Sequence, residues 1–366
     1  MSFMSQALSL AEKGRYTCMP NPMVGCVIVK NNTIIGTGAH LKAGCAHAEI
    51  NALAQAGSDA QGSEVYVTLE PCSHYGRTPP CVDALIKAHV KKVYISLLDP
   101  NPLVAGRGIA QLQAAGIEVT IGACAHDAYA LNKVFFYYIT KKKPFVIAKW
   151  AMSLDGKISV AASQLNEANR WITSEAARAH AHQLRAQVGA IIVGENTVVI
   201  DDPDLTVRYD AAKNIIVQPR PVVLTPFGNL DHERKLFKQG RNTLVITSDQ
   251  AKPSFLAMLQ KNKIEYAFVA LENNNHLSIN ETLDVLALKE ISSVLVEGGA
   301  RLLSSFFENG LVNEVYTYIA PKIIGGEDTL SAIIGKNILF QQLHNKKIIS
   351  LDSDVCIISE CDMGKK

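Results

Sequence analysis

A histidine, a glutamate and two cysteines in the first third of the chain could form a catalytic metal site. They are His47, Glu49, Cys72 and Cys81. A catalytic zinc ion takes three protein ligands and keeps a fourth position open for water, and one neutral imidazole with two thiolates supplies the three. The ion makes its bound water acidic enough to form hydroxide near neutral pH. Glu49, close to His47, is placed to carry protons between that water, a substrate ring and a leaving amine.

The fourth position of this site separates a catalytic role from a purely structural one. Structural zinc sites are usually closed by four ligands. Cys45 lies close in sequence to His47, and His74 lies close to Cys72, so either is an alternative fourth ligand. We prefer His74 as a hydrogen-bond donor in the substrate pocket. The sequence therefore predicts an open zinc site and leaves a closed one as the alternative.

The order of these residues resembles that of zinc-dependent deaminases, in which His-x-Glu is followed by Pro-Cys and a second Cys. The common spacing is Cys-x-x-Cys, whereas eight residues lie between Cys72 and Cys81. This long form, Pro-Cys-Ser-His-Tyr-Gly-Arg-Thr-Pro-Pro-Cys, resembles the RibD family of bifunctional riboflavin biosynthesis enzymes. Asn-Pro-Met-Val-Gly-Cys-Val at 21–27 and Asp-Pro-Asn-Pro at 99–102 agree. The resemblance spans essentially the whole first domain.

The resemblance implies a substrate for the metal site. It is 2,5-diamino-6-(5-phosphoribosylamino)pyrimidin-4-one, which would lose an exocyclic amine as ammonia to give the corresponding uracil. Glu49 would be the catalytic residue, and Asn21 would lie near the base. Lys42, Arg77 or Arg107 would hold the 5′-phosphate, and the sequence does not choose among them.

A second candidate site follows a predicted strand at 293–296. Glu297-Gly298-Gly299 is typical of a sharp turn, and a helix is expected from Ala300 onward. Free N–H groups at a helix start favour an anion, and glycines let it approach closely. Gly-Gly after a strand is often only a turn, and a glutamate would repel a phosphate, so we expect Glu297 to face sugar hydroxyls. The ordinary dinucleotide fingerprint, Gly-x-Gly-x-x-Gly after a strand, does not occur in this part of the sequence.

The second half of the chain resembles the reductase domain of the RibD family, which is similar to dihydrofolate reductase and uses NADPH. Matching motifs include Lys-Trp-Ala-Met-Ser-Leu-Asp-Gly-Lys at 149–157, Trp-Ile-Thr-Ser at 171–174, and Asp-Asp-Pro-Asp-Leu-Thr-Val-Arg at 201–208. The resemblance implies reduction of the ribosyl group of 5-amino-6-(5-phosphoribosylamino)uracil to a ribityl chain. The implied cofactor contacts are Ala151, Trp171, Thr197, Asp201, Thr225, Gly299, Ala300, Arg301, Leu302, Leu303, Ser304 and Ser305. The implied substrate contacts are Lys149, Asn169, Arg185, Leu205, Arg208 and Glu297.

The chemistry of this reduction fits these residue types. Two arginines can fork onto one phosphate, and a tryptophan supplies a flat apolar wall. Hydride transfer to the sugar C1′ needs a proton donor nearby, for which Lys149 and Asp155 remain alternatives. Segment 159–170 departs from the family, because it is longer and lacks the usual Gly-x-Ser before Trp-Ile-Thr. This allows the loop that contains Asn169 to close differently over a substrate.

Alternating strands and helices must position both sites. In the first part, strands are predicted at 24–30, 33–37, 64–69, 90–97 and 117–121, with helices at 46–56, 82–88 and 106–115. After Lys-Lys-Lys-Pro at 141–144 the alternation restarts, with strands at 145–150, 190–193, 222–225, 243–247, 293–296, 314–319 and 354–359 and helices at 175–186 and 300–309. This pattern is α/β, and in the first part it predicts an α/β/α sandwich. The resemblance implies a cytidine-deaminase-like α/β/α sandwich at 1–143 and a dihydrofolate-reductase-like α/β domain at 144–366.

Composition narrows the function classes. The 366 residues include 36 basic and 34 acidic side chains, a net charge of +2 that gives no strong field for a polyanion. This argues against the alternative of a polynucleotide base deaminase with an accessory binding domain. The sequence has no apolar run long enough for a membrane span and no secretory signal pattern, and its eight cysteines are scattered. We therefore expect a cytoplasmic enzyme that binds no membrane, and the resemblance implies Zn²⁺, NADPH and a homodimer. A non-catalytic scaffold stabilised by zinc is a further alternative.

Overall fold

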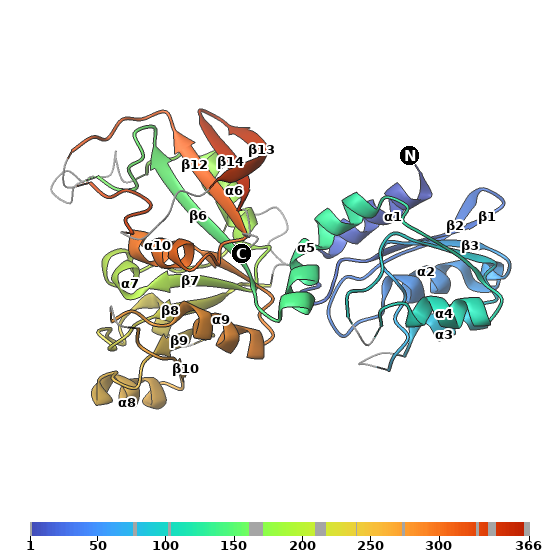
Figure 1. Ribbon diagram of the computed structural model, residues 1–366, viewed down its shortest axis with the longest axis horizontal. Coiled ribbons are helices and arrows are strands. Elements are labelled where there is room, and N and C mark those ends of the chain that lie inside the picture. Colours follow the sequence, from blue (N-terminus) through green and yellow to red (C-terminus); the bar gives the residue numbers. More distant parts are fainter. Residues whose placement is uncertain are drawn as a thin grey trace. The chain divides into compact units, whose positions relative to one another are not determined.

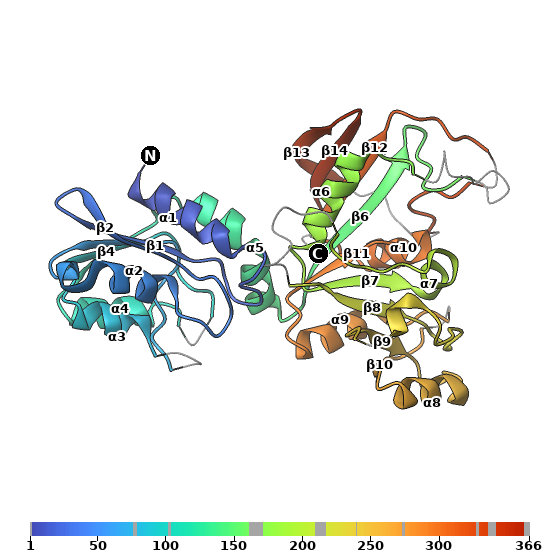
Figure 2. The ribbon, with the colours of Figure 1, turned by 180° about the vertical axis from the view of Figure 1, so that it is seen from behind.

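The chain folds into two compact units. The computed structural model describes residues 2–75, 79–101, 104–160, 171–208, 217–238, 240–272, 275–326, 329–335 and 342–361. The units are Met1–Lys142 and Lys143–Lys366, so they divide one residue before the boundary expected from the sequence. Both units can be followed in Figures 1 and 2.

The first unit is a mixed sheet covered by helices on both faces. Its strand order is β2-β1-β3-β4-β5, in which β2, β1 and β3 pair antiparallel and β3, β4 and β5 pair parallel. The strands are β1 (Gly25–Lys30), β2 (Thr33–Ala39), β3 (Glu64–Val67), β4 (Lys92–Ile95) and β5 (Glu118–Ile121). The helices are α1 (Phe3–Ala11), α2 (Ala48–Ala56), α3 (Cys81–Lys87), α4 (Arg107–Ala114) and α5 (Ala125–Lys141).

Alternating side chains of β1 divide this unit into two apolar layers. Cys26 and Ile28 pack with residues of α2, α3 and α4 on one face. Val27 and Val29 pack with Met4 and other residues of α1 on the opposite face. Figure 1 shows α1 and the first part of α5 on one side of the sheet and α2, α3 and α4 on the other. The predicted α/β/α sandwich is therefore confirmed.

Close backbone packing brings the start of α2 against the sheet. Asn31 and Asn32 form the turn between β1 and β2 with positive φ angles of 50° and 59°, a conformation that asparagine tolerates. A Cβ atom at Gly38 of β2 would lie 2.0 Å from the carbonyl oxygen of Ala48. Only glycine therefore lets β2 approach the first turn of α2, the turn that contains Glu49.

Helix α5 was not predicted, and it extends to the first residue of the lysine run at 141–143. Lys141 is the last residue of α5 and is exposed. Lys143 is not simply solvated, because its Nζ atom donates to Asn280 Oδ1 at 3.1 Å and lies 3.4 Å from Asp284 Oδ1. The boundary segment is thus a helix end followed by a residue anchored on the second unit.

The second unit is built on a large sheet with the order β10-β9-β8-β7-β11-β6-β12-β14-β13. Pairing is parallel from β10 through β12 and antiparallel at β14 and β13. The strands are β6 (Phe145–Ser153), β7 (Ala190–Gly194), β8 (Arg220–Leu224), β9 (Leu244–Thr247), β10 (Glu265–Phe268), β11 (Ser293–Val296), β12 (Glu314–Ala320), β13 (Leu343–Leu351) and β14 (Asp354–Cys361). The helices are α6 (Glu175–Arg185), α7 (Glu195–Asp201), α8 (Pro253–Lys261), α9 (Ile279–Leu288) and α10 (Ala300–Glu308).

The central strands of this sheet are buried on both faces, as is usual for parallel strands covered by helices. All four residues of β11 are buried, and its neighbours β6 and β7 contribute Val146, Ala190 and Ile192 to the same core as Leu303 and Phe306 of α10. Neither α7, α8 and α9 nor β10 and β13 were predicted. In the part of the chain that the structure describes, no helix has both the length and the apolarity to cross a bilayer.

Candidate functional site

The three predicted metal ligands lie together at the ends of separate elements. His47 is the N-cap residue of α2, Cys72 follows β3, and Cys81 is the first residue of α3. The Nδ1 atom of His47 lies 3.5 Å from Cys72 Sγ and 3.2 Å from Cys81 Sγ. All three ligand atoms lie within 4.8 Å of one another. The Cys81 backbone N–H also donates to Cys72 Sγ at 3.3 Å, which ties the two cysteine segments together.

The donor set fits a zinc ion. With ordinary Zn–N and Zn–S bond lengths, a tetrahedral ion separates a nitrogen from a sulfur ligand by about 3.5 Å, close to the separations found. Hydrogen bonds from Cys81 and His47 lower the pKa of Cys72 to about 4 despite burial. The same contact with Cys72 raises the pKa of His47, and the Cys72 thiolate together with burial raises that of Cys81. Negative charge is therefore concentrated where a divalent cation would bind.

Neither alternative fourth ligand joins this cluster. Among the described residues, the group of side chains able to hold a metal contains His47, Cys72 and Cys81 alone. Cys45 and His74 are both exposed and lie outside it. The arrangement is that of an open site with three protein ligands, the form that catalytic zinc takes.

Glu49 is suited to exchange protons beside these ligands. It lies in the first turn of α2, and only 3% of its surface is exposed. Burial, and then the negative charge of Cys72, raise its pKa to about 7. A carboxyl group with a pKa near the working pH can both accept and donate a proton.

Further polar side chains interact with one another near the metal ligands. Asn21 Nδ2 lies 3.0 Å from Nε2 of the buried His40, whose ring stacks edge-on against His47 with centroids 5.1 Å apart. Asp99 lies close enough to His74 to interact with it electrostatically, and burial raises the pKa of Asp99 to about 6. We did not predict roles for His40 or Asp99, although Asp99 lies within one of the motifs that suggested the family.

The structure does not select one of the three basic residues proposed to hold the 5′-phosphate. Lys42 and Arg107 are exposed. Arg77 lies outside the described residues. No described contact selects one of them.

The second candidate site is organised by a buried ion pair. Nε and Nη2 of Arg185, at the end of α6, donate to the two carboxylate oxygens of Glu297 at 2.7 and 2.6 Å. Burial opposes ionisation of Glu297, but Arg185 and then Lys149 outweigh it and lower the pKa of Glu297 to about 2. Each carboxylate oxygen of Glu297 accepts one hydrogen bond from Arg185 and can accept a second, so a contact between Glu297 and sugar hydroxyls stays a prediction. The Nε and Nη2 groups of Arg185 bind Glu297 in this structure, and a contact between Arg185 and the substrate stays a prediction.

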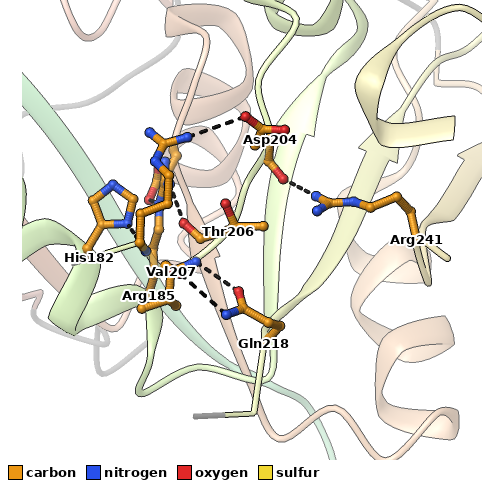
Figure 3. A network of polar contacts seen from close by, with 9 residues as sticks. His182, Arg185, Asp204, Thr206, Val207, Gln218 and Arg241 are labelled. Carbon is orange, nitrogen blue, oxygen red and sulfur yellow. Dashed lines mark hydrogen bonds and ion pairs between the residues drawn. The ribbon is translucent and has the colours of Figure 1, made fainter. Parts of the chain in front are cut away.

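Figure 3 shows a set of side chains that hold segment 204–208. Arg185 Nη1 donates to the Thr206 carbonyl oxygen at 3.0 Å. Gln218 accepts from the Val207 N–H at 2.8 Å and donates to the Val207 carbonyl oxygen at 3.3 Å. Arg241 donates to the Asp204 carbonyl oxygen. The segment that contains the predicted contacts Leu205 and Arg208 is thus fixed by three separate elements of the second unit.

Leu205 and Arg208 differ in how they could meet a ligand. Leu205 is buried, with a positive φ of 49°. The side chain of Arg208 is half exposed, and its backbone N–H donates to His182 Nδ1 at 3.2 Å. The predicted contact Asn169 lies outside the described residues.

Three glycines lie at the end of β7 and before the start of α10. The Gly194 N–H donates to the Gly298 carbonyl oxygen at 3.3 Å, and a Cβ atom added at either glycine would meet nothing within 4 Å. At Gly299 the added atom would lie 3.5 Å from Thr197 Oγ1. Glycines and the backbone N–H groups of a helix start suit the pyrophosphate of a dinucleotide, so the residues present fit a nicotinamide dinucleotide.

The other expected cofactor contacts divide by exposure. Trp171, Asp201 and Arg301 are exposed, and Ala151, Leu302 and Ser305 are partly exposed. Buried in contrast are Thr225, Ala300, Leu303 and Ser304. The Thr225 hydroxyl donates to Glu195, and the Ser304 hydroxyl accepts from Ile334 and Gly335. The side chain of Leu303 packs in the core, so Leu303 could meet a cofactor only through its backbone, and the cofactor contacts at 299–305 stay a prediction.

Asp155 does not have the properties of a proton donor. Its carboxylate accepts from the Ser153 hydroxyl at 2.5 Å and from the N–H groups of Gly325 and Ile324 at 2.7 and 3.1 Å. These bonds lower the pKa of Asp155 to about 2. Asp155 is therefore ionised at neutral pH and holds a loop, which leaves Lys149 as the remaining candidate.

Both halves of the chain match known protein families. Residues 1–97 match the family described as "Cytidine and deoxycytidylate deaminase zinc-binding region", and residues 144–357 match the "RibD C-terminal domain". The riboflavin biosynthesis protein RibD of Aquifex aeolicus is 40% identical over 359 residues, covering 97% of each chain. The chain belongs to the RibD family. RibD proteins are bifunctional deaminase/reductases of riboflavin biosynthesis, and a zinc-binding deaminase region and a reductase domain are both present here.

Solved structures of RibD proteins have the same fold over nearly the full chain. RibD of Acinetobacter baumannii is 38% identical with a TM-score of 0.88, covering 98% of this chain and 97% of the other. A Thermotoga maritima protein described as a diaminohydroxyphosphoribosylaminopyrimidine deaminase/5-amino-6-(5-phosphoribosylamino)uracil reductase is 33% identical with a TM-score of 0.82, covering 98% and 97%. The predicted order, a deaminase-like unit followed by a dihydrofolate-reductase-like unit, is confirmed.

Proposed function

We propose that the first unit deaminates 2,5-diamino-6-(5-phosphoribosylamino)pyrimidin-4-one and that the second unit reduces 5-amino-6-(5-phosphoribosylamino)uracil with NADPH. The observation that carries the proposal is the convergence of His47 Nδ1 with the sulfurs of Cys72 and Cys81 beside the buried Glu49. The name of the related Thermotoga maritima protein supports both substrates.

In the first unit, zinc would supply a Lewis acid that makes water reactive near neutral pH. His47, Cys72 and Cys81 would hold it. Glu49 would take a proton from the attacking water and deliver it to the leaving amine, a role for which a pKa of about 7 is suited. Asn21, hydrogen-bonded to His40, would position the base.

In the second unit, NADPH would supply hydride to the sugar C1′. Trp171, Thr197 and the glycines before α10 would bind the cofactor. Lys149 would contact the substrate and donate the proton, because burial lowers its pKa and so eases proton release. Its cation also faces the Tyr318 ring at 5.7 Å. The Arg185–Glu297 pair would hold segment 204–208 in place for the substrate.

We also propose that the protein is cytoplasmic and homodimeric. All eight cysteines are free, which agrees with a reducing compartment. The dimer is inferred from the family resemblance.

Mass spectrometry of the products tests the proposal. Purified protein is incubated with the diaminopyrimidinone phosphate, first without and then with NADPH. We expect a product in which one amino group is replaced by oxygen, and with NADPH a second product that has gained a pair of hydrogens. Unchanged substrate in both incubations, from folded and zinc-loaded protein, would refute the proposal.

A further inference from the structure

Asn132 interrupts helix α5 deep inside the first unit. Its backbone angles, φ −112° and ψ 16°, are not helical, and α5 is kinked there. Only 2% of its surface is exposed. Asparagine is a poor residue for a helix interior, and a buried amide is costly unless its polar atoms are paired. Its side chain must therefore have specific partners.

Those partners are the two backbone polar groups of one distant residue. Asn132 Oδ1 accepts from the Met23 N–H at 2.8 Å, and Asn132 Nδ2 donates to the Met23 carbonyl oxygen at 2.9 Å. The amide thus pairs with Met23 as a neighbouring strand would. This pair of hydrogen bonds joins residues 109 positions apart and fixes the segment between α1 and β1.

The same segment contains Asn21, whose side chain is hydrogen-bonded to His40, the residue that packs against the metal ligand His47. The Asn21 N–H donates to the Cys18 carbonyl oxygen at 2.9 Å. On the other side, His40 Nδ1 lies 3.2 Å from the Ala46 carbonyl oxygen, which can only accept, so Nδ1 carries the proton and Nε2 is the acceptor. Nε2 therefore receives the Asn21 Nδ2–H group at 3.0 Å. This orientation leaves Asn21 Oδ1 as the amide atom that can accept a hydrogen bond from a pyrimidinone N–H.

We propose that Asn132 is a positioning residue for deamination, which fixes Met23 and thereby holds the Asn21 amide in the orientation that binds the pyrimidine. The inference rests on the deaminase function proposed above. It places a determinant of the first activity 35 residues beyond the region that matches the deaminase family, which ends at residue 97. Helix α5 then contributes to substrate binding by the deaminase unit, in addition to connecting the chain to the second unit.

A double-mutant cycle tests this role. Asn132→Ala, Asn21→Ala and the double variant are prepared in the full-length, zinc-loaded protein. We expect Asn132→Ala to lower kcat/KM for ammonia release by about tenfold or more, chiefly through KM, because misplacement of a binding group weakens a productive complex. If Asn132 acts through Asn21, adding Asn132→Ala to Asn21→Ala causes no further loss.

Two controls separate positioning from general damage. Zinc content and NADPH oxidation with the deaminated substrate are measured on every variant, and both should equal those of the wild type. Thr140→Ala, which removes an exposed side chain from the same helix, should leave ammonia release unchanged. If Asn132→Ala does not fold, the cycle is run with Asn132→Asp, which keeps the acceptor for the Met23 N–H.

The outcomes are distinct for the two claims. Wild-type kinetics in Asn132→Ala, an effect additive with that of Asn21→Ala, or a parallel loss of zinc would overturn the positioning role. Failure of the proposed function would appear differently, because the wild-type protein itself would then release no ammonia.

Discussion

The charges at the metal centre depend on one another. Cys72 ionises easily because Cys81 and His47 donate hydrogen bonds to its sulfur, whereas the pKa of Cys81 is raised by the thiolate beside it and by burial. A bound cation offsets the repulsion between the two negatively charged sulfurs, so both cysteines can then be ionised. Loss of either sulfur should therefore impair metal binding far more than loss of a nearby thiol outside the cluster.

Cys81→Ala is expected to reduce bound zinc from about one ion per chain to a small fraction of that, because two protein ligands hold the ion poorly. Cys45→Ala is the matched control, since this thiol is close in sequence to His47 but lies outside the cluster. Elemental analysis of the purified variants measures the effect. Full zinc in Cys81→Ala, or its loss in Cys45→Ala, would show that the ligands are misidentified.

The Arg185–Glu297 pair predicts a pH dependence of stability. The pKa of Glu297 is lowered to about 2, below the value of about 4.3 in an unfolded chain. Its contribution is therefore complete above that unfolded value and is lost as the pH falls toward 2. Glu297→Gln should destabilise the second unit by about 3 kcal/mol at neutral pH and flatten the fall in stability between about pH 4.5 and 2.

Urea unfolding at several pH values checks this expectation. Glu290→Gln changes an exposed acid of the same unit and should leave the pH dependence as it is in the wild type. Parallel curves for wild type and Glu297→Gln would mean that the carboxylate is not stabilised by its cations.

At the scale of helices and strands, contacts between different elements hold the metal ligands in position. The Glu70 carboxylate accepts from the N–H groups of Gly106 and Gly108 at 3.0 and 3.1 Å, which fixes the start of α4. A Cβ atom at Gly108 would lie 2.4 Å from the Pro71 carbonyl oxygen. This close approach sets the position of the segment that contains Cys72.

Gly108→Ala should therefore move Pro71 and Cys72 together. We expect a loss of about 1–3 kcal/mol in stability and faster release of zinc to a competing chelator. Ala110→Ser, on the exposed side of the same helix, is the control and should release zinc at the wild-type rate. Equal rates for both variants would indicate that α4 does not support the ligand.

Most strands could be predicted from the sequence, because a strand that is buried on both faces appears as a continuous run of apolar residues. The strand predictions that became β1, β6, β7 and β11 are confirmed. Short apolar runs that are rich in β-branched residues and bounded by turn signals favour a strand over a helix. Helices α8 and α9 were missed although Pro253 and Ser278 mark their starts. Short amphipathic helices between such strands give a weaker periodic signal than the strands themselves.

The two sites differed in how far residue type alone could define them. His47, Cys72 and Cys81 were found because metal ligation restricts both the residue types and their spacing. Asn132, Gln218 and the Arg185–Glu297 pair could not be assigned roles in the same way. Each acts on a partner distant in sequence, and amides and ion pairs have no local pattern that identifies the partner.

At the scale of the whole molecule, two units with separate cores contain the two sets of functional residues. The core of the first unit is built from β1, β3 and β4 with α2, α3 and α4, and that of the second from β6, β7 and β11 with α9 and α10. Within the described part of the chain, neither of these two cores includes residues of the other unit. We therefore expect that a substitution in one unit can abolish deamination or reduction without affecting the other activity.

The most direct test of this central claim measures ammonia release and NADPH oxidation side by side in wild type and Glu49→Gln, each supplied with the diaminopyrimidinone and with its deaminated product. The predicted result is a fall in ammonia release of about 10²- to 10⁴-fold with unchanged NADPH oxidation on the deaminated product and unchanged zinc content. Ammonia release at the wild-type rate, or loss of both activities in a folded protein, would contradict the account.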